Sequence, residues 1–185
     1  MTVRPATLPN VFGVLAEMLP TVTTIGYLHN PTVGVAEARI KAVEAAARAH
    51  NVQLVIENAG NPYEIEPAFK RLVAQNMGAL VFGNSPLFIA RTGQLVELAA
   101  RYAVPAIYPY REQVEAGGLM SYGSSIFDAW RLAGIYAGRI LKKERADNFS
   151  AQQSGKIELV INMRTAKALD LVVPTALVSR ADHVI

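Results

Sequence analysis

The sequence predicts an α/β fold in which a mostly parallel β-sheet is flanked by helices. Strand-like and helix-like segments alternate almost to the end of the 185-residue chain, and this alternation is typical of parallel strands with right-handed crossovers. The strand-like segments are continuous apolar runs, as expected for strands that are buried on both faces. The composition, 51% hydrophobic and 18% charged, is typical of a globular protein.

Short runs rich in β-branched and apolar residues mark the strands. The first, VTTIGYL at residues 22–28, ends at a His-Asn-Pro turn. We expect five strands in one mostly parallel sheet, at residues 22–28, 52–57, 79–82, 105–108 and 119–122, and a further strand at residues 157–161.

Segments with helical spacing lie between these strands. Asn61 followed by Pro62 illustrates the local chemistry, because Asn caps helices and Pro suits the first turn. The predicted helices cover residues 11–19, 35–50, 62–76, 86–102, 110–116, 126–142 and 165–169. Residues 143–155 are polar and predict a linker, and the tail after Pro174 predicts a polar turn.

Composition excludes several classes of function. The net charge of +3 comes without a clustered basic stripe, so we expect no nucleic-acid partner. The chain has no cysteine, which excludes disulfides, Cys-zinc sites and thiol nucleophiles. His29, His50 and His183 lack metal-ligand spacing, and no G-x-G-x-x-G or Walker A sequence is present. We therefore expect no metal, no cofactor and no catalytic residue.

In parallel sheets ligands bind beyond the carboxyl ends of the strands. Asn84 and Ser85 follow one such end; they can cap the next helix, and the backbone N–H groups there can also bind an anion such as a carboxylate. The stretch YPYRE at residues 108–112 brings two phenols, a guanidinium and a carboxylate together at one strand end. There Arg111 can bind a carboxylate and Glu112 an ammonium group, unless both are simply solvated in a first helical turn.

Ser121 and Tyr122 lie at the end of the next strand. Side chains alternate across a strand, so at most one of these two points toward any given side.

Several longer motifs carry a family resemblance. They include LAARYAVPAIY at residues 98–108, GGLMSYG at 117–123, GIYAGRIL at 134–141 and IELVIN at 157–162. From Leu15 to the end, the chain resembles the C-terminal half of ABC transporter substrate-binding proteins, in the branch that includes tryptophan- and phenylalanine-binding members.

The resemblance implies a lobe like that of type I periplasmic binding proteins. Residues 1–124 would form the α/β ligand-binding lobe, and residues 125–185 the crossover helix, linker and strand-helix segment that complete it. The implied function is solute binding for an ABC importer, with a permease as partner, no enzyme activity, and a small organic ligand such as an amino acid. The implied ligand contacts are Asn84, Ser85, Tyr108, Glu112, Ser121 and Tyr122.

The resemblance also implies a periplasmic location, because family members carry a signal peptide and a first lobe. The residues after Met1 lack the charged and apolar regions of a secretory signal, so the expectation becomes cytoplasmic if Met1 is the true start.

Two other classes of function stay open. The alternation alone also fits a Rossmann- or flavodoxin-like enzyme. The chain can also be a self-associating regulatory domain that pairs as a homodimer through the helix at residues 126–142, which has two apolar stripes. One stripe is expected to cover the sheet and the other to face a first lobe or a second copy, unless the tail at residues 149–185 covers it.

Overall fold

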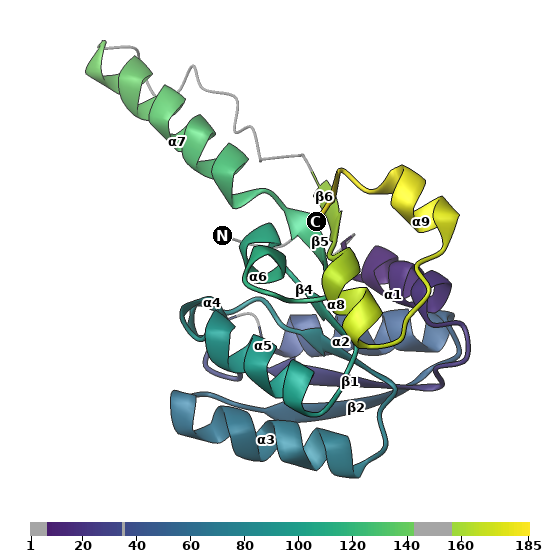
Figure 1. Cartoon of the computed structure of the whole chain (residues 1–185). Coiled ribbons are helices and arrows are strands. Elements are labelled where there is room, and N and C mark those ends of the chain that lie inside the picture. The colour runs from purple at the N-terminus through teal and green to yellow at the C-terminus, as the bar shows by residue number, and fades with distance from the viewer. Residues whose placement is uncertain (1–6, 35, 143–156) are drawn as a thin grey trace.

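The computed structural model describes residues 7–34, 36–142 and 157–185 (Figure 1). Within these residues the strands form one seven-stranded sheet in the order β2-β1-β3-β4-β5-β6-β7. The strands are β1 (Thr24–His29), β2 (Gln53–Asn58), β3 (Ala79–Phe82), β4 (Ala106–Tyr108), β5 (Met120–Ser124), β6 (Ile157–Ile161) and β7 (His183–Val184). Neighbouring strands are parallel except β5 and β6. The predicted fold class and all six predicted strands are confirmed.

The helices follow the predicted alternation. They are α1 (Thr7–Met18), α2 (Ala36–Ala49), α3 (Pro62–Ala74), α4 (Pro86–Ala90), α5 (Thr92–Arg101), α6 (Arg111–Glu115), α7 (Ile126–Leu141), α8 (Met163–Ala168) and α9 (Thr175–Arg180). Asn61 caps α3 as predicted, because its side chain accepts hydrogen bonds from the backbone of Tyr63 and Glu64.

Two predictions about local structure are wrong. The single helix expected at residues 86–102 is divided at Arg91 into α4 and α5. The tail contains α9 and β7 instead of a polar turn, because the fully buried Leu177 anchors α9 and β7 pairs with β6. The predicted linker at 143–155 lies outside the described residues.

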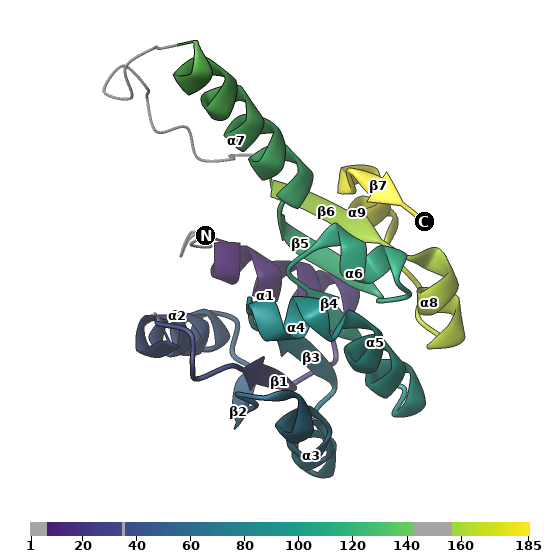
Figure 2. The same ribbon diagram turned by 90° about the vertical axis from the view of Figure 1, so that its left-hand side faces the viewer.

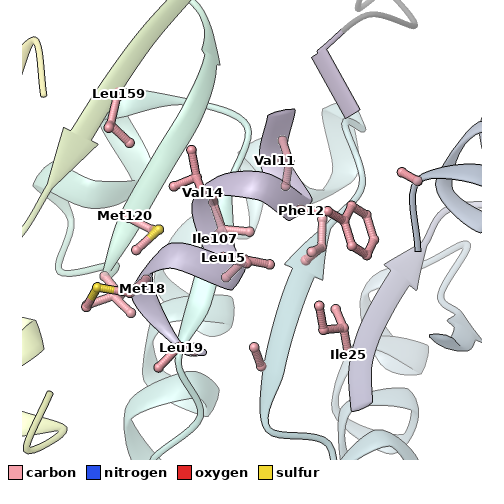
Figure 3. Close-up of a cluster of buried hydrophobic side chains, with 14 of the residues drawn as sticks. Val11, Phe12, Val14, Leu15, Met18, Leu19, Ile25, Ile107, Met120 and Leu159 are labelled. Atoms are coloured by element: carbon pink, nitrogen blue, oxygen red, sulfur yellow. The ribbon is translucent and has the colours of Figure 1, made fainter. Parts of the chain in front are cut away.

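Two hydrophobic clusters hold the sheet between its helices. On one face α1 inserts Phe12, Leu15 and neighbouring side chains against Ile25 and Ile107 of the strands (Figure 3), and α2 packs beside it. On the other face α3 and α5 cover Leu28 and further strand residues. The strict alternation along each strand explains the continuous apolar runs of the sequence.

Helix α7 projects away from this body (Figures 1 and 2). None of its residues is buried, and Phe127 and Trp130 are 78% and 73% exposed. The expectation that one of its stripes covers the sheet is therefore wrong, since α1, α2, α3 and α5 already occupy both faces. The described part of the tail packs against the core instead, with Leu177 in the cluster around α1.

Among the described helices, none combines the length and the apolar character needed to span a membrane.

Candidate functional site

The loops that follow β1, β3, β4 and β5 meet at one edge of the sheet, because these four strands are adjacent and parallel. We call this the carboxyl edge. It carries polar residues from each loop, namely His29, Asn30, Asn84, Ser85, Tyr110, Arg111, Glu112, Ser124 and Ser125. The sequence predicted this gathering from the strand pattern.

A buried hydrogen bond joins the first two loops. Asn30 Nδ2 donates to Ser85 Oγ at 2.8 Å, and both residues are buried. Ser85 Oγ also accepts from Leu87 N and so caps α4. Asn30 Oδ1 accepts from the backbone and hydroxyl of Thr32. Ser85 therefore has the structural role that was one of its two predicted alternatives, and its hydroxyl also fixes Asn30.

Arg39 of α2 reaches the same edge. Its Nη1 donates to the Asn84 carbonyl oxygen, and this bond connects α2 with the loop after β3. Sequence reasoning missed Arg39, since nothing local to α2 indicates that a residue in its first turn contacts a loop 45 positions away.

His29 and Tyr27 lie under this network on one face of β1. Their rings stack with centroids 5.8 Å apart. Burial, with the nearby charge of Arg39 as a smaller cause, lowers the pKa of the His29 imidazole. Burial raises the pKa of Tyr27 to about 12, although Arg39 opposes the shift. His29 Nε2 is buried and has no hydrogen-bond partner among the described residues. Both groups are neutral near pH 7, so Arg39 is the charged member of the cluster.

A pocket of about 290 Å³ lies at the other end of the carboxyl edge. We call it the edge pocket. It is lined by Arg111, Glu112, Glu115, Ser121, Gly123, Ser124, Ser125, Ile126, Phe127 and Glu158. Among its charged residues, Arg111 pairs with Glu115, and Glu112 contributes a further carboxylate. The pocket brings together two of the predicted contacts, Glu112 and Ser121.

Arg111 and Glu112 have different surroundings within the edge pocket. Arg111 Nε donates to Glu115 Oε1 at 2.6 Å, so its expected role in binding a carboxylate competes with an ion pair inside α6. Glu112 is exposed in the first turn of α6. Gly123 also lines the pocket, and a Cβ atom at this position would lie only 2.1 Å from the Pro109 carbonyl oxygen. Only glycine allows β5 to approach the loop after β4 this closely.

Tyr108 lies in the interior and not at the surface of the carboxyl edge. Its ring is 2% exposed and stacks on Phe82 with centroids 4.8 Å apart. Burial raises the pKa of its phenol, and the hydroxyl has no partner among the described residues.

Tyr122 points to the face of the sheet opposite Ser121. It packs against the cluster around α1, and its hydroxyl accepts a hydrogen bond from Asn10 Nδ2 at 3.3 Å. Ser121 and Tyr122 therefore lie on opposite faces, as their adjacent positions on β5 predicted.

An open, mostly parallel sheet between two helical layers, with polar loops and a pocket at its carboxyl edge, is the arrangement in which α/β domains commonly bind ligands. No group of three or more residues that could hold a metal ion is present in the part of the chain that the structure describes. The chain belongs to the family described as ABC transporter substrate binding protein, whose model matches residues 10–185. This confirms the family resemblance of the sequence motifs.

Solved structures share the fold at low sequence identity. A conserved domain protein from Vibrio cholerae O1 biovar El Tor is 21% identical with a TM-score of 0.86, over 96% of this chain and 60% of that one. An ABC domain from Streptococcus pneumonia in complex with L-Trp is 18% identical with a TM-score of 0.85, over 97% and 62%. A ligand-free, open substrate-binding protein with adhesive properties from Clostridium difficile is 18% identical with a TM-score of 0.69, over 99% and 60%.

The chain thus spans about three fifths of the length of these solved proteins. No curated protein matches it. The fold is that of periplasmic binding proteins, and the family is one of substrate-binding proteins and not of enzymes.

Proposed function

We propose that this chain is a solute-binding component of an ABC importer and that its carboxyl edge forms one wall of the binding site for a small organic solute. The observation that carries the proposal is the edge pocket, which combines Glu112 and Ser121 in a chain of the substrate-binding family. An amino acid is the proposed ligand class, because the exposed carboxylate of Glu112 in the pocket suits an ammonium group. The related S. pneumonia structure contains L-Trp, which supports the same class.

The predicted contact residues take different parts in this proposal. Glu112 binds the ammonium group, while Ser121 offers a hydroxyl on the pocket wall. Asn84 and Ser85 shape the neighbouring loop through their hydrogen bonds. Tyr108 and Tyr122 support the wall of the binding site from inside the protein. The Tyr108 ring is buried against Phe82, and the Tyr122 ring packs against the cluster around α1.

We assign ligand binding to the lobe at residues 1–124, which residues 125–185 complete. The permease of the importer is the proposed protein partner, and the compartment outside the cytoplasmic membrane is the proposed location.

Family membership argues against the Rossmann- or flavodoxin-like enzyme that the alternation of strands and helices alone allowed.

Isothermal titration of this chain, and of a form that includes any adjoining lobe, with a panel of amino acids tests the proposal. Heat of binding with at least one amino acid is the expected result. Absence of binding to every member of the panel by both forms would refute the proposed function.

We also propose that α7 mediates pairing of two copies of the chain. Its exposed side carries Phe127, Trp130, Gly134, Gly138 and Leu141, which lie within one face at helical spacing. A Cβ atom at either glycine would meet nothing within 4 Å, although each glycine lowers helix stability by up to about 1 kcal/mol. This combination suits a close helix-helix contact.

A second copy of α7 fits this side when the two helices run antiparallel about Gly134. Positions at equal distance from Gly134 then meet, so Trp130 lies over Gly138 of the other helix and Phe127 lies beside Leu141. Burying these side chains stabilises the pair by several kcal/mol at roughly 25 cal/mol per Å², before the cost of association. Twofold pairing is also the commonest symmetry of oligomers.

A further inference from the structure

We infer that the edge pocket contains a carboxylate subsite, formed by backbone N–H groups in the first turn of α7 together with the hydroxyl of Ser121. The inference rests on the proposed function and adds to it the place where the carboxylate of an amino acid binds. Glu112, which is proposed to bind the ammonium group, lines the same pocket. Both charged groups of one ligand therefore have a partner within a single pocket.

Helix α7 begins at the edge pocket. It follows directly on β5 (Figures 1 and 2), and residues 124–127 all line the pocket. The helix has 16 residues, so its aligned peptide dipoles place about half a positive charge at this end. The end of α7 that lines the pocket therefore attracts an anion.

Two backbone donors in this first turn are not used. The Ser125 hydroxyl caps α7 and accepts from Asp128 N at 3.2 Å. The N–H groups of Ile126 and Phe127 lie between these two residues and have no acceptor among the described residues. The Asp128 carboxylate pairs with Arg131 at 2.7 Å, further along the helix. Two N–H groups at the positive end of α7 thus stay available to a ligand.

Ser121 adds a donor from a different element. It lies on β5, is only 1% exposed and lines the edge pocket. Its hydroxyl has no hydrogen-bond partner in the part of the chain that the structure describes. Buried hydroxyls normally have a partner, because an unpaired one lowers stability. A carboxylate oxygen accepts from a hydroxyl and from a backbone N–H alike, so one carboxylate can use all of these donors.

The charged residues of the edge pocket suit a zwitterion better than a simple anion. Three glutamates line the pocket, namely Glu112, Glu115 and Glu158, and Glu115 pairs with Arg111. The exposed carboxylate of Glu112 repels an anion but attracts an ammonium group on the same ligand. An amino acid is therefore bound most favourably with its ammonium group toward α6 and its carboxylate toward the start of α7.

Ile126→Pro removes one of the proposed donors and keeps the helix. Ile126 is the first residue of α7, where Pro is well tolerated because the helix does not use this N–H. The preceding Ser125 has the extended backbone that a following Pro requires, with φ −63° and ψ 117°. Ile126→Ala is the matched control, because it removes the same side chain but keeps the N–H. Ser121→Ala removes the hydroxyl without adding bulk to the buried site.

Three probes separate the two ligand groups: L-tryptophan, tryptamine, which lacks the carboxylate, and indole-3-propionate, which lacks the ammonium group. Isothermal titration uses the form of the protein that binds amino acids. Ser121→Ala, compared with the wild type, and Ile126→Pro, compared with Ile126→Ala, should each bind L-tryptophan and indole-3-propionate roughly ten- to a hundredfold more weakly. In the same two comparisons the affinity for tryptamine should not change.

The subsite is overturned, and the proposed function stands, if these substitutions change the affinities for all three probes by the same factor or change none of them. If no form of the protein binds an amino acid, the proposed function fails, and acetate tests the subsite directly. The backbone N–H signals of Ile126 and Phe127 in NMR spectra should then shift on addition of acetate to the wild type, and should shift less in Ser121→Ala. No shift in the wild type, or equal shifts in the two proteins, overturns the subsite as well.

Discussion

Asn30 and Ser85 are 55 positions apart in the chain, yet Asn30 Nδ2 donates a hydrogen bond of 2.8 Å to Ser85 Oγ in the interior. The bond fastens the loop after β1 to the loop after β3. Since Ser85 Oγ also accepts from Leu87 N, one hydroxyl caps α4 and joins two loops of the carboxyl edge.

Replacing Ser85 with Ala should lower the free energy of unfolding by about 2–4 kcal/mol. Loss of the cap accounts for about 1 kcal/mol, and the buried Asn30 amide left without its acceptor costs about 1–3 kcal/mol. Urea unfolding measures the change. Ser125→Ala is the matched control, because Ser125 caps α7 by a single bond to Asp128 N, and it should cost only about 1 kcal/mol. Equal losses in the two variants would show that the bond to Asn30 contributes nothing.

Tyr108→Phe should raise the free energy of unfolding by about 1 kcal/mol, because it removes a buried hydroxyl that has no partner among the described residues. The ring and its stacking on Phe82 stay in place. Tyr122→Phe provides the contrast, since it removes a hydroxyl that accepts a hydrogen bond from Asn10 Nδ2, and it should lower the free energy of unfolding by about 0.5 kcal/mol. Thermal or urea unfolding measures the stability of the two variants. A Tyr108→Phe variant that is less stable than the wild type contradicts the prediction.

His29 should make the protein less stable in mild acid. Burial lowers its pKa in the folded state below the ordinary value of 6.5, so the unfolded chain binds a proton first as the pH falls. The contribution is therefore complete above pH 6.5 and is lost as the pH falls toward the lowered value. The free energy of unfolding of the wild type, measured against pH, should fall more steeply below pH 6.5 than that of His29→Gln. Parallel curves for the two proteins rule out the effect.

Glu112→Gln should weaken binding of an amino acid about tenfold or more while sparing a plain carboxylate, because it removes the charge proposed to hold the ammonium group. Titration with L-tryptophan, and with indole-3-propionate, which lacks the ammonium group, measures the two affinities. Glu97→Gln is a suitable control, since Glu97 is exposed on α5 and pairs with Arg101. If the substitution changes the affinities for the two ligands by the same factor, the assigned role of Glu112 is refuted.

Trp130→Glu should convert a dimer into a monomer, because a charge would replace the large ring proposed to lie over Gly138 of the second helix. Size-exclusion chromatography with light scattering at micromolar concentration measures the mass. Tyr63→Glu is the control, since Tyr63 is a 90% exposed aromatic residue of α3, and α3 lies far from α7 in both ribbon views (Figures 1 and 2). A wild type that is strictly monomeric and binds no hydrophobic dye contradicts the proposed pairing.

Much of the fold could be predicted because its signals are local. The apolar run that forms β1 and the Asn-Pro pair that begins α3 act through neighbouring residues. The division of the helix at Arg91 and the strand β7 could not be predicted in this way. Leu177 and His183 gain their roles only from the cluster around α1 and from pairing with β6.

The sequence by itself determined the strands, the helices and the polar loops at the strand ends, because periodicity and capping depend on residues close together in the chain. Only the tertiary structure decided which side chains of these loops reach the surface. Tyr108 turns inward onto Phe82, Tyr122 turns toward α1, and Arg39 arrives from a helix that the ligand motifs do not include. These outcomes depend on which strand face each residue occupies and on contacts across 26 or more positions, where packing and not local chemistry selects the partner.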